Sequence, residues 1–130
     1  RQFSIFIAGD QYASTTGNKI VCYHGGTLGA RAGNVSTTNV CDGKWHQVIV
    51  FSTTGNSYNY IYIDGVYNDE SSNATINMSE NPDYIIGAFG NAGSYLNPFD
   101  GSVSNVKYYN RVLSADEILQ NYNALRERYY

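Results

Sequence analysis

A change in hydrophobic period near residue 114 constrains the fold more than any other feature of this sequence. Before it, short apolar or alternating runs are separated by turn residues such as Gly, Asn and Asp. This pattern predicts β-strands joined by short turns. The expected strands cover residues 3–8, 19–23, 28–31, 35–41, 45–52, 58–63, 84–87 and 103–109. Asp64-Gly65 is a strong hairpin signal after one of them.

The pattern after residue 114 predicts one helix at the C-terminus. Ser114 and Glu117 have the spacing of a capping box, in which each side chain bonds the backbone N–H of the other residue. Apolar side chains then recur at helical spacing, at Ile118, Tyr122, Leu125 and Tyr129. We expect this helix to run to about Arg128.

The chain has the size of one domain, and we expect residues 1–130 to form a single β-sandwich domain. It has no internal repeat and no linker, and its aromatic content of 15% argues against disorder. The first residue is Arg1 and not Met. We therefore expect the domain to be the C-terminal part of a longer protein.

Charge and hydropathy exclude two classes of partner. The net charge is −3 and the sequence pI is about 5.1, so the chain offers no basic face for nucleic acid. It contains no apolar run near the ~20 residues of a membrane span, so we expect no membrane insertion. The low fraction of charged residues and the many Asn, Thr and Gly residues are typical of extracellular proteins, so we expect an extracellular location.

The two cysteines, Cys22 and Cys41, match no zinc-binding pattern. We expect them to form a disulfide, with Cα atoms less than about 7 Å apart. The alternative is two separate buried thiols that act as small hydrophobic residues. Three N-glycosylation sequons also occur, at Asn34, Asn73 and Asn77.

Four ordered segments carry a family resemblance. They are Gly-Lys-Trp-His-Gln-Val at 43–48, Ile-Tyr-Ile-Asp-Gly at 61–65, Tyr-Ile-Ile-Gly at 84–87, and the stretch from Phe-Asp-Gly at 99–101 through residues 106–118. Together they resemble the laminin G-like, concanavalin A-like lectin/glucanase jelly-roll domains of the non-catalytic type. The resemblance covers roughly residues 43–122.

The resemblance implies an all-β fold: a two-sheet antiparallel jelly-roll sandwich with one C-terminal helix. Family members carry an opening pair of strands that is absent here, which would leave a sheet edge exposed. Strand alternation then predicts which side chains point into the core. These are Val48, Val50, Ile61, Ile63, Ile86, Val106 and Tyr108.

The acidic residues do not have the spacing of a glycosidase. Retaining enzymes need two carboxyl groups about 5–5.5 Å apart, which on a strand requires acidic residues two positions apart. The close acidic pairs here are adjacent, Asp69-Glu70 and Asp116-Glu117. His24 and His46 lie near no nucleophile motif, so we expect no enzymatic activity.

A row of tyrosines suggests a binding surface. Alternation places Tyr58, Tyr60 and Tyr62 on one face of their strand and Ile61 and Ile63 on the other. Aromatic rings can stack on the apolar faces of sugars. With Asn-bearing loops beside them, the predicted carbohydrate-binding residues are Tyr58, Tyr60, Tyr62, Asn91, Tyr95 and Asn97. The alternative is that the tyrosines only stabilise the sheet.

The family resemblance also raises the question of calcium. Loop acids that could bind it are Asp69, Glu70, Glu80, Asp83 and Asp100. Calcium needs six to eight oxygens and the sequence has no dense Asp run, so we expect no cofactor.

Two functions follow from these expectations. The first is a carbohydrate-binding or adhesion module of a secreted or virion-surface protein, with a glycan or polysaccharide as its partner. The second is a structural virion or extracellular filament protein whose sandwich packs against identical copies, or against other parts of the parent protein.

Overall fold

The computed structural model describes residues 3–7, 17–25, 31–52, 58–72, 86–91, 94–96 and 98–129. Its elements are β1 (Phe3–Ile7), β2 (Lys19–Gly25), β3 (Arg31–Asn39), β4 (Val48–Ser52), β5 (Tyr58–Ile63), β6 (Val66–Ser72), β7 (Phe89–Asn91), β8 (Ser94–Leu96) and α1 (Ala115–Tyr129).

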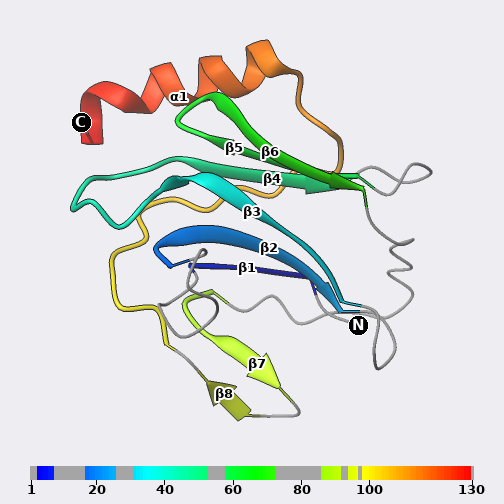
Figure 1. Cartoon of the computed structure of the whole chain (residues 1–130). Coiled ribbons are helices and arrows are strands. Elements are labelled where there is room, and N and C mark those ends of the chain that lie inside the picture. Colours follow the sequence, from blue (N-terminus) through cyan, green and yellow to red (C-terminus); the bar gives the residue numbers. More distant parts are fainter. Residues whose placement is uncertain are drawn as a thin grey trace.

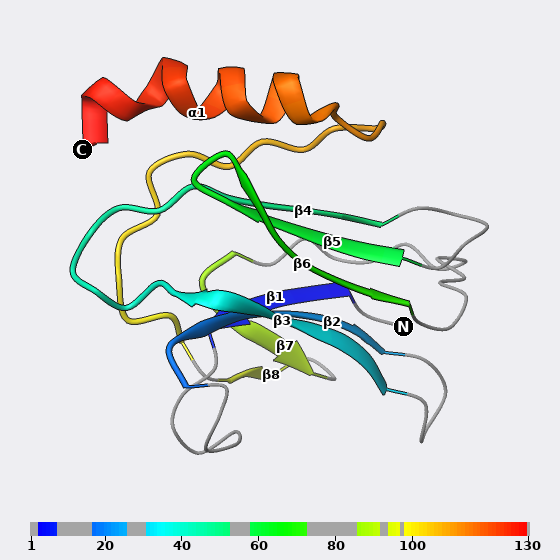
Figure 2. The same ribbon diagram turned by 45° about the horizontal axis from the view of Figure 1, so that its top comes forward.

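The strands form two layers and a separate hairpin. Sheet A has the order β1-β2-β3, sheet B the order β4-β5-β6, and β7 pairs with β8. All these pairs are antiparallel. Sheet B lies between sheet A and α1, while the β7–β8 hairpin lies beyond sheet A (Figures 1 and 2). The predicted all-β sandwich with one C-terminal helix is confirmed, and the arrangement is consistent with a jelly roll.

The Asp64-Gly65 turn sets the register of sheet B. Both residues have positive φ, 54° and 79°, as a two-residue type I′ hairpin turn requires. The turn brings Val66 opposite Ile63, and a bulge then moves Asp69 opposite Ile61. The hairpin signal predicted this turn, whereas β6 was not among the expected strands.

The core lies between the two sheets. Its buried cluster consists of Ile20, Cys22, Val40, Ile61 and Ile63. Of the predicted core, Ile61 and Ile63 are confirmed, and the partly buried Val48 and Val50 pack against the same cluster.

Three predicted core residues are wrong. Ile86, Val106 and Tyr108 are 64%, 57% and 74% exposed. Within the described residues, the expected strand at 103–109 joins no sheet. The alternation of apolar residues in this segment therefore does not show which side chains are buried. Alternation separates buried from exposed side chains only in a strand of a sheet with one covered face.

Asn68 of β6 connects the two sheets at one edge. Its Oδ1 accepts a hydrogen bond from Thr37 N of β3 at 2.7 Å, and its Nδ2 donates to Thr38 Oγ1 at 2.6 Å. The side chain thus satisfies backbone and side-chain groups that an open sheet edge would leave unpaired.

The predicted disulfide between Cys22 and Cys41 is not formed. Cys22 is fully buried in β2, while Cys41 is exposed beyond the end of β3. Lys19 of β2 pairs with Asn39 of β3. Because the strands are antiparallel, the chain moves away from this pair in opposite directions to reach Cys22 and Cys41. At about 3.3 Å per residue, this offset exceeds the reach of a disulfide.

We expect the two thiols to react differently with iodoacetamide. Burial raises the pKa of Cys22 to about 12, and the thiolate is the reactive form. Mass spectrometry should therefore find Cys41 alkylated in the native protein and Cys22 alkylated only after unfolding. Two thiols that stay unmodified until a reductant is added would contradict this structure.

The start of α1 is held by the predicted capping box. Glu117 N donates to Ser114 Oγ at 3.2 Å, and Ser114 N donates to Glu117 Oε2 at 2.8 Å. Arg111 adds two hydrogen bonds to the Glu117 carboxylate, at 2.8 and 2.7 Å. The Arg111 bonds and the Ser114 N–H together lower the pKa of Glu117 to about 2. The helix then buries Ile118 completely.

Replacing the capping serine tests this account. Ser114→Ala should destabilise the domain by about 1 kcal/mol, because one backbone N–H of the first turn loses its acceptor. Denaturant unfolding measures the change, and Ser102→Ala, at another exposed serine, serves as the control. Equal stability of the two variants would rule out the cap as a source of stability.

Candidate functional site

The outer face of sheet B carries four aromatic side chains from all three strands, here named the aromatic row. They are Phe51 of β4, Tyr60 and Tyr62 of β5, and Tyr67 of β6. Alternation produces this face, because Asn59, Ile61 and Ile63 occupy the inner face and are buried. The row therefore faces the side of sheet B on which α1 lies (Figure 2).

The rings of the row contact one another across the strands. Phe51 stacks on Tyr60 and Tyr62 at centroid distances of 4.8 and 5.9 Å, with interplanar angles of 18° and 25°. Tyr67 meets Tyr62 edge to face, at 5.5 Å and 67°. Such pairs stabilise a sheet. Tyr67 is 45% exposed, whereas Tyr60 and Tyr62 are half-buried, so Tyr67 presents the most open ring.

The structure brings together only part of the predicted carbohydrate-binding set. Tyr60 and Tyr62 lie in the row, and Tyr58 belongs to the same strand. Asn91 and Tyr95 belong to β7 and β8, on the far side of sheet A (Figure 1). Asn97 lies outside the described residues.

Two members of the row, Phe51 and Tyr67, were missed by sequence reasoning. Phe51 lies within an expected strand at alternate spacing from Ile49, so the alternation already placed it on the outer face. Tyr67 follows the hairpin turn by two residues, and a hairpin requires a returning strand. Treating Asp64-Gly65 as a complete hairpin would have found it.

His46 is held between two carboxylates. Its Nδ1 lies 2.7 Å from Asp64 Oδ2, and its Nε2 lies 3.0 Å from Asp42 Oδ1. The protonated ring can donate to both carboxylates. Burial acts to lower the pKa of His46, but the hydrogen bonds to Asp64 and Asp42 outweigh it and raise the pKa above its ordinary value. Both ring nitrogens therefore contact a carboxylate.

Asp64 also fixes the residue that follows His46. Its Oδ1 accepts a hydrogen bond from Gln47 N at 2.9 Å, and its own N–H donates to Gln47 O at 2.9 Å. Two hydrogen bonds to the backbone of Gln47, one from the Asp64 backbone N–H and one to the Asp64 carboxylate, therefore attach the start of β4 to the β5–β6 turn.

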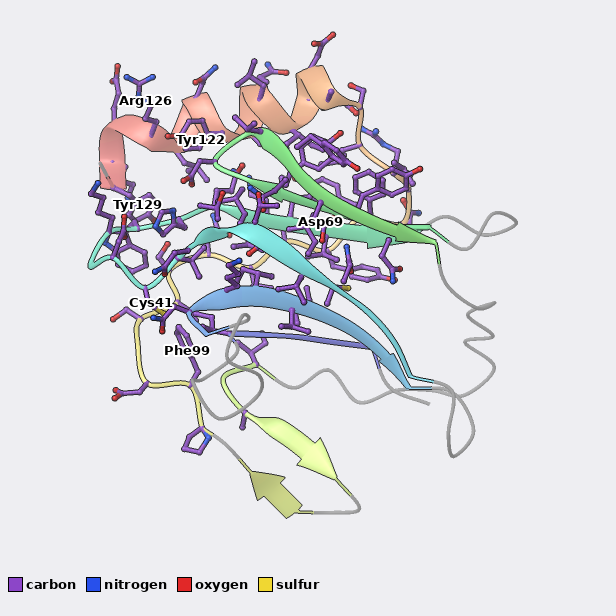
Figure 3. All side chains as sticks on the ribbon, viewed as in Figure 1. Cys41, Asp69, Phe99, Tyr122, Arg126 and Tyr129 are labelled. Atoms are coloured by element: carbon purple, nitrogen blue, oxygen red, sulfur yellow. The ribbon has the colours of Figure 1, made fainter. Side chains whose placement is uncertain are left out.

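A small cavity, here named the Trp45 pocket, lies between α1 and the segment before β4. Its volume is about 70 Å³, and its lining residues are Trp45, His46, Gln47, Ser104, Asn105, Tyr122, Leu125 and Tyr129. Tyr122 and Tyr129 lie on the side of α1 that faces the strands, whereas Arg126 points away (Figure 3). The Trp45 and Tyr129 rings are 5.4 Å apart at 46°.

Within the described ranges, no group of three or more His, Cys, Asp or Glu could hold a metal ion. Of the acids considered for calcium, Asp69 and Glu70 lie in β6 and Asp100 is exposed. Glu80 and Asp83 lie outside those ranges. None of the described helices is long and apolar enough to cross a membrane.

Comparison with known proteins gives one family and one structural neighbour. A laminin G family model, described as the concanavalin A-like lectin/glucanases superfamily, matches residues 2–119. Among solved structures, an S-layer domain-containing protein (residues 221–444) from Clostridium thermocellum ATCC 27405 is similar, at 24% sequence identity and a TM-score of 0.55. The similarity covers 82% of this chain and 52% of that chain, so this chain spans about half its length. At this identity the likeness shows the fold alone. No curated protein matches.

The raised pKa of His46 predicts the pH dependence of stability. The contacts of protonated His46 with Asp64 and Asp42 should add to the free energy of unfolding. This contribution should be complete below the ordinary histidine pKa and should be lost as pH rises through the raised pKa of the folded state. Denaturant unfolding of the wild type and His46→Gln across pH 5–9 tests this, since the difference between their free energies of unfolding should shrink as pH rises. His24→Gln, at the other histidine, is the control. If the free energies of unfolding of wild type and His46→Gln differed by the same amount at every pH, the ion pairs of His46 would not contribute to stability.

Proposed function

Because the chain belongs to the concanavalin A-like lectin/glucanase superfamily, we propose that it is a non-catalytic carbohydrate-binding module of an extracellular or cell-surface protein. The observation that carries the proposal is the aromatic row on the outer face of sheet B. A saccharide presents C–H faces that pack on aromatic rings, and its hydroxyl groups bond to polar side chains. The partly exposed Tyr67 and the neighbouring Tyr62 supply both kinds of contact.

The positions of the acidic residues support a binding role without catalysis. Asp69 and Glu70 occupy adjacent positions in β6, whereas two positions on one face of a strand are two residues apart. Asp116 and Glu117 lie in the first turn of α1, where Glu117 is engaged by Arg111 and Ser114. Neither arrangement suits the pair of facing carboxyl groups that glycoside hydrolysis uses.

The proposed location rests on the family and on the neighbour's title. Laminin G-like domains fit an extracellular module, and the solved neighbour is titled an S-layer domain-containing protein. A surface location would place the aromatic row where it can meet polysaccharide.

A structural role in contacts between copies is the second candidate, and the segment at 98–114 favours it. Val103, Val106, Tyr108 and Val112 are all exposed on this segment. Large contiguous patches of exposed apolar side chains mark interaction surfaces, and a contact between copies would cover these four side chains. Sedimentation velocity over a range of concentrations tests this role. Association that Val106→Asp abolishes would support it, and a monomer at every concentration would contradict it.

Alanine substitution in the aromatic row tests glycan binding. A glycan array first identifies a saccharide, and calorimetry then compares variants with it. Tyr67→Ala should weaken binding about tenfold, since burial of roughly 50 Å² of ring face is worth about 1.3 kcal/mol. Tyr108→Ala, at an exposed tyrosine outside the row, should leave the affinity unchanged.

Two results would count against the row as the binding surface. One is full affinity in Tyr67→Ala, and the other is an equal loss in Tyr108→Ala. Thermal unfolding of each variant separates a loss of binding from a loss of fold.

A further inference from the structure

Sheet B ends at β4, and the outer edge of this strand is open. At the start of the β4–β5 ladder, Asp64 N donates to Gln47 O, and hydrogen-bonded pairs alternate along an antiparallel ladder. Val48 and Val50 therefore direct their backbone N–H and C=O groups away from β5. Among the described residues, no other backbone group bonds these outward donors and acceptors. Because both residues are partly buried, the edge holds unpaired polar backbone groups beside the core.

The segment at 98–112 runs past this edge and is fixed at both ends. Phe99 N donates to Gly87 O at 2.8 Å, and Leu113, which follows the segment, is buried just before the capping box of α1. Between these points every residue is exposed, and none belongs to a sheet. In both views the chain follows the direction of β4 from its yellow end to the start of α1 (Figures 1 and 2). The segment is therefore held in place without being paired.

The Trp45 pocket shows that this segment lies near β4. Ser104 and Asn105 line the pocket together with Trp45, His46 and Gln47, the residues that lead into β4. Paired strands lie about 4.8 Å apart and are joined by regular backbone hydrogen bonds, whereas no such bond joins residues 103–109 to β4. The pocket therefore lies between two chain segments that are neighbours but do not pair with each other.

A polypeptide backbone is the ligand whose chemistry matches these two edges. The outward N–H and C=O groups of an edge strand recur every two residues, as they do at Val48 and Val50, and an added strand presents its own groups at the same spacing. One face of an added strand would lie over the core beside Val48 and Val50, and its other face would adjoin Phe51 of the aromatic row. Strands covered on both faces are apolar at successive positions. The matching strand therefore carries apolar side chains on both faces.

We propose that β4 and residues 103–109 form a strand-acceptor site, here named the strand slot, to which an extended segment of another polypeptide adds as an antiparallel strand. Because β4 and residues 103–109 run in the same direction (Figure 2), one added strand is antiparallel to both. Residues 103–109 then join the three strands of sheet B through the added strand, which gives their alternation a paired neighbour. This inference does not depend on carbohydrate binding.

Two synthetic peptides test the strand slot. The probe is RQFSIFIAG, the sequence of residues 1–9, which has apolar side chains on both faces when extended. The control peptide carries Ile5→Pro, which removes an N–H and interrupts a ladder. Calorimetry should show the control binding at least about tenfold more weakly than the probe. Trp45, the only tryptophan of the chain, lies at one end of the slot, so its fluorescence should change with the probe.

Proline substitutions in the protein locate the binding edge. Val50→Pro removes a donor that faces away from β5, so sheet B should keep its ladder while the affinity for the probe falls at least about tenfold. Successive N–H groups of an extended chain point to opposite edges. One of Val106→Pro and Lys107→Pro therefore removes a donor that faces β4 and weakens binding, while the other is its matched control. Both positions are exposed, so this pair keeps the test valid if thermal unfolding shows that Val50→Pro does not fold.

Hydrogen exchange followed by NMR distinguishes strand addition from other binding. The Val48 and Val50 amides should become protected when the probe is added. Absence of probe binding, equal binding of both peptides, or a bound probe that leaves these amides unprotected would overturn the strand slot. If the protein alone sediments as a dimer in which the two amides are already protected, the edge belongs to a second copy and the proposal is wrong.

Discussion

The carboxylate of Asp64 is the interaction on which the outer half of the molecule depends. It lies in the β5–β6 turn and bonds both His46 and the backbone of Gln47. The neighbouring Gly65 has positive φ, and a Cβ there would lie only 3.3 Å from Tyr122 of α1. One turn thus sets the register of sheet B, fixes the start of β4 and contacts α1. Sequence alone identified this turn but not its contacts with the helix.

The two candidate binding features are consequences of this arrangement. Register across the turn places Tyr62 opposite Tyr67, which completes the aromatic row. The bonds between Asp64 and Gln47 hold the backbone of Gln47, a residue that lines the Trp45 pocket. The aromatic row therefore lies on paired strands joined by a fixed turn, which keeps the cost of ordering a binding surface low.

Local signals in the sequence predicted most of the fold, and long-range packing accounts for what they missed. The capping box at Ser114 and the inward Ile61 and Ile63 follow from short-range rules and are confirmed. The strand expected at 103–109 failed, because alternation in Val106 and Tyr108 describes a strand only when a neighbour pairs with it. The disulfide failed for a similar reason, since spacing in sequence does not fix the pairing register. The row was half predicted, because Tyr67 comes from a strand that was not anticipated.

The burial of Asn34 sets a limit on how this chain can be produced. Asn34 heads the sequon Asn34-Val35-Ser36, yet it is 2% exposed in β3, opposite Cys22 of β2. A bulky glycan cannot occupy that interior position, so glycosylation at Asn34 and the native pairing of β2 with β3 exclude each other. In a host that attaches glycans during translocation, modification would compete with folding.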